Sequence, residues 1–109
     1  MNEFTVTSMT KDAMGDCDAT ALAKKIAGKE VSASEVLEAA IARAELVNPK
    51  LNAIVTESFD LSLEQARQDT QSHSGKGVFA GVPTFVKDNT DVKGLPTLFG
   101  SNAVSKRPA

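Results

Sequence analysis

A lysine, an aspartate and an asparagine stand side by side at Lys87, Asp88 and Asn89, directly after the apolar run Thr84–Val86. The run predicts a buried strand, whose end would deliver the Lys87 amine into a loop where polar groups can converge. Burial at that point would favour the neutral amine, which is the form that a general base needs. A solvated lysine at the end of a strand has the same spacing, so the local pattern leaves both roles open.

The polar and turn-forming neighbours of the lysine have two interpretations as well. Asp88 and Asn89 can orient the lysine or brace its loop through hydrogen bonds, and they can equally satisfy the backbone of a turn. Gly81, Pro83 and Gly100 interrupt the apolar sequence and predict structural turns. Because no G-x-G-x-x-G or G-x-x-x-x-G-K-[ST] pattern is present, the glycines do not indicate a nucleotide site.

Three runs of this region together resemble the lysine motif of the amidase-signature family, namely Gly81–Asn89, Gly94–Thr97 and Gly100–Ser101. Upstream, Val31–Glu35 and Val47–Ala53 resemble the N-terminal helical region of the same family. The resemblance spans roughly residues 18–104. It implies a Ser–cis-Ser–Lys triad in which Lys87 is the catalytic lysine.

The resemblance also implies a mechanism for this lysine. Lys87 would exchange a proton through the bridging serine and so activate the nucleophilic serine, and the resulting acyl-enzyme would pass its acyl group to water or to ammonia. Both serines and the loop with oxyanion donors lie further along family chains, and Ser101 and Ser105 do not match their motifs. We therefore expect an N-terminal fragment of a carboxamide amidohydrolase that is inactive alone and takes an amide substrate only with the remainder of its domain.

Three other functions remain open from the sequence. The chain can be a fragment of the A subunit of glutamyl-tRNA amidotransferase, by the same resemblance. It can instead be a non-catalytic helical module that binds a partner through the apolar stripe of a helix at residues 33–47. Finally, it can be a small self-sufficient structural domain in which Lys87 is an ordinary surface residue.

Composition excludes several classes of function. The 109 residues include 12 Lys plus Arg against 14 Asp plus Glu, a net charge of -2, so no basic field is available for nucleic acid or an anionic membrane. Nor does any run approach the roughly 20 apolar residues of a membrane span. With one cysteine, Cys17, and one histidine, His73, no metal or cofactor is expected. The cytoplasm is the expected compartment, and a homo-oligomer stays open.

Apolar periodicity, together with capping and helix-breaking residues, predicts the helices and strands that must position these residues. Residues 1–15 read as a mobile tail, and residues 16–109 as the amidase fragment. An amphipathic helix is expected from Asp18 to Gly28. A second helix begins at about Ala33, where Ser32 and Glu35 form a capping box, and ends at Asn48-Pro49.

The rest of the chain predicts two strands and one more helix. The apolar run at residues 51–55 indicates a strand, the polar stretch at 57–74 a surface helix that frays into a loop at 72–77, and residues 84–86 the second strand. The order of these elements indicates an α/β fold, with N-terminal helices packed on part of a mixed sheet as an incomplete piece of the amidase-signature fold. Further strands are expected outside this sequence, because two strands alone make a poor sheet.

Overall fold

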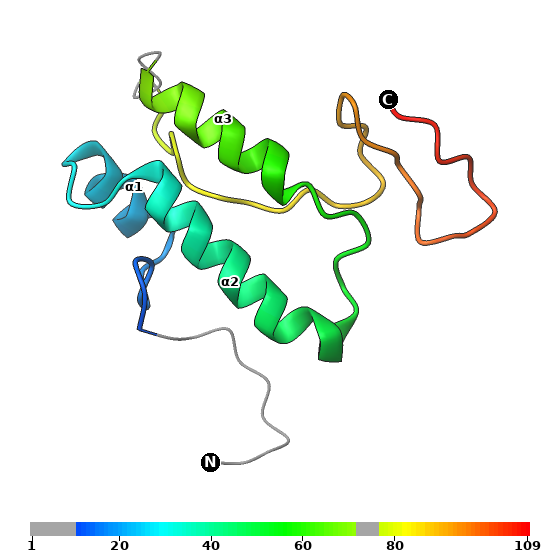
Figure 1. The fold of residues 1–109 in the computed structure, drawn as a ribbon, viewed down its shortest axis with the longest axis horizontal. Helices are drawn as coiled ribbons and strands as arrows, with labels where there is room; N and C mark the ends of the chain where they lie inside the picture. The colour runs from blue at the N-terminus through cyan, green and yellow to red at the C-terminus, as the bar shows by residue number, and fades with distance from the viewer. Residues whose placement is uncertain (1–10, 72–76) are drawn as a thin grey trace.

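Three helices make up all the regular structure in the described part of the chain. The computed structural model describes residues 11–71 and 77–109. The helices are α1 (Ala19–Ala27), α2 (Ala33–Leu51) and α3 (Phe59–Gln71), and residues 77–109 follow as turns and irregular chain (Figure 1). The described residues contain no strand. The predicted α/β fold with a mixed sheet is therefore wrong, and this structure is helical.

Helix α1 has a polar cap at its start and a left-handed residue after its end. The Asp18 carboxylate accepts the N–H of Ala21 at 2.8 Å. Gly28, which the sequence marked as the closing residue, has a φ of -79°, and the left-handed residue is Lys29, at 61°. The N–H groups of Lys29 and Glu30 bond to carbonyl oxygens of the last helical turn at 3.1 and 2.9 Å, the pattern of a Schellman motif.

The predicted capping box of α2 is confirmed. The backbone N–H of Glu35 donates to Ser32 Oγ at 3.0 Å, and the backbone N–H of Ser32 donates to Glu35 Oε1 at 3.0 Å. Each side chain thus satisfies the other residue's orphan donor at the helix start. This reciprocal pair fixes the position at which the longest helix begins.

Helix α2 does not end at Asn48-Pro49, as its sequence predicted, but continues to Leu51. Pro49 lacks one backbone donor, which removes one helical bond without preventing a further turn. The chain leaves the helix where Asn48 Oδ1 accepts the N–H groups of Ala53 and Ile54, both at 2.9 Å. The C-cap is Asn52, with a left-handed φ of 51°, so the helix ends at an asparagine beyond the proline.

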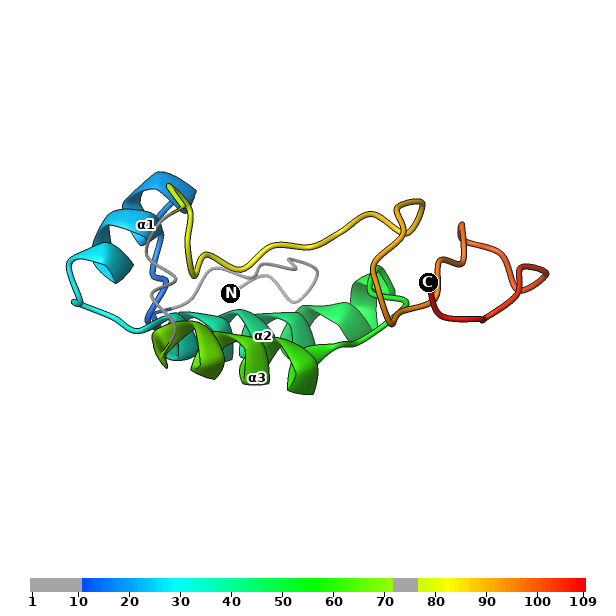
Figure 2. The ribbon, with the colours of Figure 1, turned by 90° about the horizontal axis from the view of Figure 1, so that it is seen from above.

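Neither predicted strand forms. Leu51 belongs to α2, and the backbone N–H groups of Ala53 and Ile54 donate to Asn48. These two donors are therefore not available for pairing with a neighbouring strand. Residues 82–87 do run as an elongated segment across the helices (Figure 2), but no described segment pairs with them as a strand. A strand needs a hydrogen-bonded neighbour, and apolar composition alone does not supply one.

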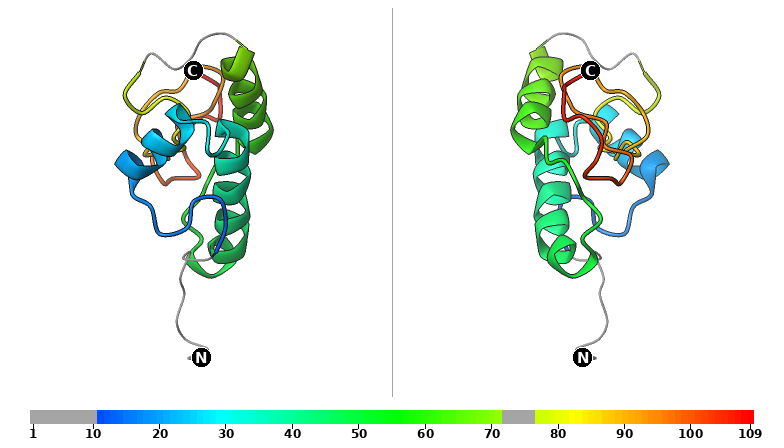
Figure 3. Two further views of the ribbon diagram at one scale, coloured as in Figure 1. Left: turned by 90° about the vertical axis from the view of Figure 1, so that its left-hand side faces the viewer. Right: turned by 90° about the vertical axis from the view of Figure 1, so that its right-hand side faces the viewer.

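The molecule is flat, with a shortest extent of 20 Å, and has two layers. Helices α2 and α3 pack side by side in one layer, while α1 and the elongated segment lie across the other face (Figures 2 and 3). The buried apolar residues of the described chain are mostly small: Leu22, Ala23, Val36, Ala39, Ala44 and Ala66. Small side chains let the layers approach closely, but they bury little apolar surface.

The predicted tail lies mainly outside the described residues, which begin at Lys11. Asp12, near its end, is anchored to α2 by an ion pair with Arg43. The predicted loop at 72–77 also lies outside the described residues, except for Gly77. Within the described part of the chain, no helix is long and apolar enough to cross a membrane.

Candidate functional site

Lys87 lies at the end of the elongated segment, where the chain turns. Its carbonyl oxygen accepts the N–H of Thr90 at 3.1 Å, which closes a turn over residues 87–90. The Lys87 side chain is exposed and makes no ion pair or hydrogen bond with the described residues. Its amine is therefore accessible, and its position depends on the backbone that carries it.

Lys87 lines an open groove with a volume of about 1040 Å³. One wall is the apolar stripe of α2, including Leu37, Ile41 and Val47, and the other wall is the segment 83–89. The start of α3, the connection at 53–56, Met14, Phe99 and Gly100 also line it. The groove can accept an apolar group beside an amine, which suits a ligand that has both an apolar and a polar part.

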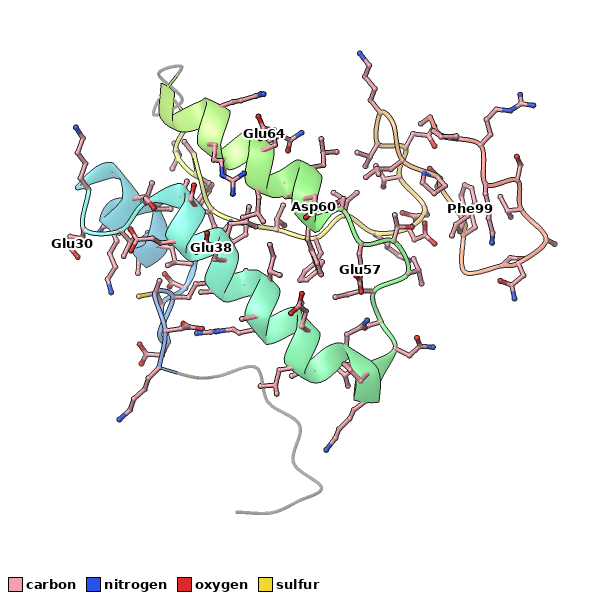
Figure 4. The ribbon with its side chains drawn as sticks, in the orientation of Figure 1. Glu30, Glu38, Glu57, Asp60, Glu64 and Phe99 are labelled. Carbon is pink, nitrogen blue, oxygen red and sulfur yellow. The ribbon has the colours of Figure 1, made fainter. Side chains whose placement is uncertain are left out.

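The outer side of the helix pair has a different character from the groove. Glu38 on α2 and Asp60 and Glu64 on α3 are exposed and labelled in Figure 4, and none of them lines the groove. These three carboxylates therefore lie outside the groove that Lys87 lines. This separation follows from helical periodicity, which places apolar and charged residues on opposite faces.

Asp88 connects the lysine turn to a second turn ten residues later. Its Oδ1 accepts the N–H of Leu98 at 2.9 Å, its carbonyl oxygen accepts the N–H of Phe99 at 3.0 Å, and its Oδ2 makes a longer contact of 3.4 Å with the N–H of Gly100. Asn89, in contrast, makes a local contact, in which the hydroxyl of Thr90 donates to Asn89 Oδ1 at 3.2 Å. The two polar neighbours of Lys87 therefore have different surroundings.

The predicted turn residues occupy different kinds of position. Gly81 has a φ of 85°, and a Cβ built on it would lie 3.0 Å from the Cβ of Ala33, so it is constrained by both conformation and space. Pro83 follows at the start of the groove wall and is half-buried. Gly100 has a φ of 69° and open space around it, in a turn closed by the N–H of Ser101.

Two serines of the groove were missed by reasoning from the sequence. Ser58 and Ser62 line it near the start of α3. Their spacing is ordinary for the first turn of a helix, where serine is common, so no signal in the sequence marks them. They become visible only once the segment 83–89 is placed opposite α3.

The strongest electrostatic contact lies on the far wall of the groove. Arg43 donates to Asp12 through Nε at 2.8 Å and through Nη2 at 2.7 Å, and Nη2 also donates to the carbonyl of Gly15 at 2.6 Å. The Arg43 hydrogen bond, helped by the N–H groups of Gly15 and Met14, lowers the pKa of Asp12 to about 2, and Asp12 in turn raises the pKa of Arg43. A bidentate pair of this kind fixes residues 12–15 against α2.

No group of potential metal ligands occurs among residues 11–71 and 77–109. Cys17 is a free, half-buried thiol, and His73 lies outside the described residues. The described chemistry of the groove therefore consists of one amine, one guanidinium, carboxylate and amide groups, and hydroxyls. These groups can exchange protons and donate or accept hydrogen bonds.

Comparison with known proteins identifies relatives for nearly the whole chain. The family model described as Amidase matches residues 35–109. A putative amidase of Mycobacterium leprae is 51% identical over 98 residues, an acylamidase of Rhodococcus erythropolis 39% over 97 residues, and the A subunit of the glutamyl-tRNA(Gln) amidotransferase of Carboxydothermus hydrogenoformans 41% over 83 residues. These matches cover 90%, 84% and 73% of this chain but only 20%, 20% and 17% of the relatives. No solved structure matches the chain.

Proposed function

The chain belongs to the amidase family, and from this premise we propose that it carries Lys87 as the proton-transferring lysine of an enzyme that cleaves carboxamide C–N bonds. One observation carries the proposal. The lysine of the family-like motif lines a groove large enough for a small amide. Of the two environments that the sequence left open, the described structure has the exposed one, so the proposal requires the remainder of the domain to bury the amine and favour its neutral form.

The proposed chemistry is acyl transfer through a Ser–cis-Ser–Lys triad. Lys87 accepts a proton from the nucleophilic serine through the bridging serine, and the serine oxygen bonds to the amide carbon. The C–N bond then breaks, and the leaving nitrogen takes the proton. Water cleaves the acyl ester and restores the free serine. No Gly-Gly-Ser-Ser-Gly run is present in the sequence, so we expect no activity from this chain alone.

A chimera tests this proposal directly. The matched 97 residues of the Rhodococcus erythropolis acylamidase are replaced by those of this chain, and amine or ammonia release from simple amides is measured. Lys87→Ala is expected to lower kcat/KM by about 10³-fold, within the usual range for loss of an acid–base group. Lys93→Ala, which removes an exposed lysine outside the groove, is the matched control and should leave the rate unchanged.

Two results of this experiment would exclude the proposal. If Lys87→Ala retains the rate of the unmodified chimera, Lys87 is not the proton-transferring group. If the 109-residue chain alone releases ammonia from an amide and Lys87→Ala does not affect it, the chemistry lies elsewhere in the chain. Circular dichroism of each variant separates loss of catalysis from loss of folding.

Two alternatives make different predictions in this assay. The amidotransferase alternative is supported by the 41% identity to the Carboxydothermus hydrogenoformans relative, and it requires the ammonia released from a carboxamide to be passed to an activated carboxyl group, whose leaving group it displaces, rather than to solvent. A helical binding module would use the α2 stripe that lines the groove, and it would be insensitive to Lys87→Ala. Amide hydrolysis is preferred because the putative amidase of Mycobacterium leprae matches more of the chain at higher identity.

We propose a cytoplasmic location on the single cysteine, which forms no internal disulfide. Self-association is proposed as well, since Phe85 and Phe99 expose 72% and 62% of their surface. Exposed aromatic side chains of this kind commonly mark contact surfaces.

A further inference from the structure

Three successive backbone N–H groups, from Leu98, Phe99 and Gly100, point to a single residue, Asp88. The carboxylate takes the first and the third, and the Asp88 carbonyl takes the second. One residue therefore accepts from three of the four N–H groups of the turn at 98–101, and the fourth, from Ser101, bonds to the Leu98 carbonyl. Hydrogen bonds to a charged acceptor are roughly twice as strong as neutral ones.

The turn at 98–101 needs this support because of its backbone conformation. Phe99 has a φ of 54° and Gly100 one of 69°. The left-handed region is unfavourable for a residue with a Cβ, and Phe99 is 62% exposed, so packing of its ring contributes little to holding it there. The acceptors of Asp88, together with the bond from the N–H of Ser101 to the Leu98 carbonyl, favour the observed conformation.

Lys87 is the residue most affected by this arrangement. Its side chain is long, exposed and without a described partner, so its backbone decides which part of the groove its amine can reach. On its C-terminal side that backbone is held by two contacts, the turn to Thr90 and the bonds of the adjacent Asp88. Catalysis by a proton-transferring group depends on its placement to within about 1 Å.

We propose that Asp88 is a positioning residue for Lys87, which holds the lysine turn on the turn at 98–101 and keeps the amine beside the Phe99 wall of the groove. This inference rests on the proposed function of Lys87. The positioning role is assigned to Asp88 and not to Asn89, because the described hydrogen bond of Asn89 is with the adjacent Thr90. Asp88 alone connects the lysine to a distant part of the loop.

The acylamidase chimera provides the test, with Asp91 as the matched control. Asp91 also braces this loop, through the hydroxyl of Thr97 at 2.8 Å, but it contacts neither Lys87 nor residues 98–100 in any described hydrogen bond. Asp88→Ala is expected to lower kcat by about 10²-fold with little change in KM, because misplacement affects the reacting geometry more than binding. Asp88→Asn keeps one oxygen for Leu98 and should lose about tenfold, while Asp91→Ala should stay within about threefold.

Amide hydrogen exchange of the 109-residue chain gives a second readout. Asp88→Ala should accelerate exchange at residues 98–100, and Asp91→Ala should not. The inference is overturned if Asp88→Ala keeps the full rate while Lys87→Ala is inactive, or if Asp88→Ala and Asp91→Ala lose activity equally. If Lys87→Ala itself is fully active, the proposed function fails and the inference fails with it.

Discussion

The helical region at residues 11–71 and the irregular region at 77–109 are held by different interactions. The helices use caps, buried alanines and a bidentate ion pair, all of which act on the regular elements. The irregular region uses turns and two aspartates that bond to backbone or hydroxyl groups. The proposed catalytic lysine lies in the second region, so a few polar contacts, rather than a packed core, determine its geometry.

The largest loss of folding stability is expected at Gly81, where the irregular region touches the helices. Gly81→Ala places a Cβ at 3.0 Å from Ala33 Cβ and 3.3 Å from Ile26 Cγ2, in addition to the cost of its positive φ. We expect a loss of about 3 kcal/mol in the free energy of unfolding, measured with urea and circular dichroism. Gly94→Ala has the same φ of 85° and open space, so it should lose only about 1 kcal/mol.

Equal losses in the two glycine variants would show that the contact with the helices carries no energy. The two regions would then be independent, and the groove between them would have no fixed width. A larger loss at Gly81 would establish that the irregular region is stabilised by its contact with α1 and α2.

The next largest loss of stability is expected when acid breaks the ion pair inside the helical region. The pKa of Asp12 is lowered from 3.8 to about 2 by Arg43 and nearby N–H groups, so the unfolded chain binds more protons than the folded chain between these values. The ion pair therefore stabilises the fold above about pH 4, and its contribution of about 2 kcal/mol is lost as the pH falls through about 2. Urea unfolding at about pH 5 and about pH 2 measures this loss.

Asp12→Asn should remove that part of the pH dependence, whereas Asp16→Asn, at an exposed residue without a described ion pair, should keep it. A wild-type pH dependence in Asp12→Asn would mean that other carboxylates cause it. Hydrogen exchange at residues 98–100 should be unchanged by Asp12→Asn if the two regions are stabilised separately.

The smallest change in the free energy of unfolding is expected at the end of α1. Lys29 holds a φ of 61° at the position where glycine is favoured, so Lys29→Gly should raise the free energy of unfolding by about 1 kcal/mol. Lys25→Gly, inside the helix, should lower it by about the same amount. Thermal unfolding measures both changes, and a destabilised Lys29→Gly variant would contradict the assigned conformation of this cap.

Local signals predicted the helices well, because caps and periodicity act within a few residues. Ser32 and Glu35 form their capping box as expected, and the polar stretch after residue 57 does form a helix. The two strands failed because apolar composition cannot show whether a hydrogen-bonded neighbour exists. The end of α2 was missed because the helix continues past Pro49 to a left-handed C-cap at Asn52, after which Asn48 Oδ1 accepts the next N–H groups.

The candidate site was only partly visible in the sequence. Lys87 was found through its motif, and the family match covers it. The contact of Asp88 with residues 98–100 could not be predicted, since it requires Phe99 to adopt a conformation that non-glycine residues avoid. The groove hydroxyls of Ser58 and Ser62 depend on tertiary placement, which no local pattern encodes.

The alanine-rich core has a thermodynamic consequence. Four of the six buried apolar residues in the described chain are alanines, so unfolding exposes little new apolar surface to water. The heat capacity of unfolding scales with that surface and should fall below the usual value of about 12–15 cal/mol/K per residue. A small heat capacity change flattens the curve of stability against temperature, so cold denaturation of this chain should need a lower temperature than is usual.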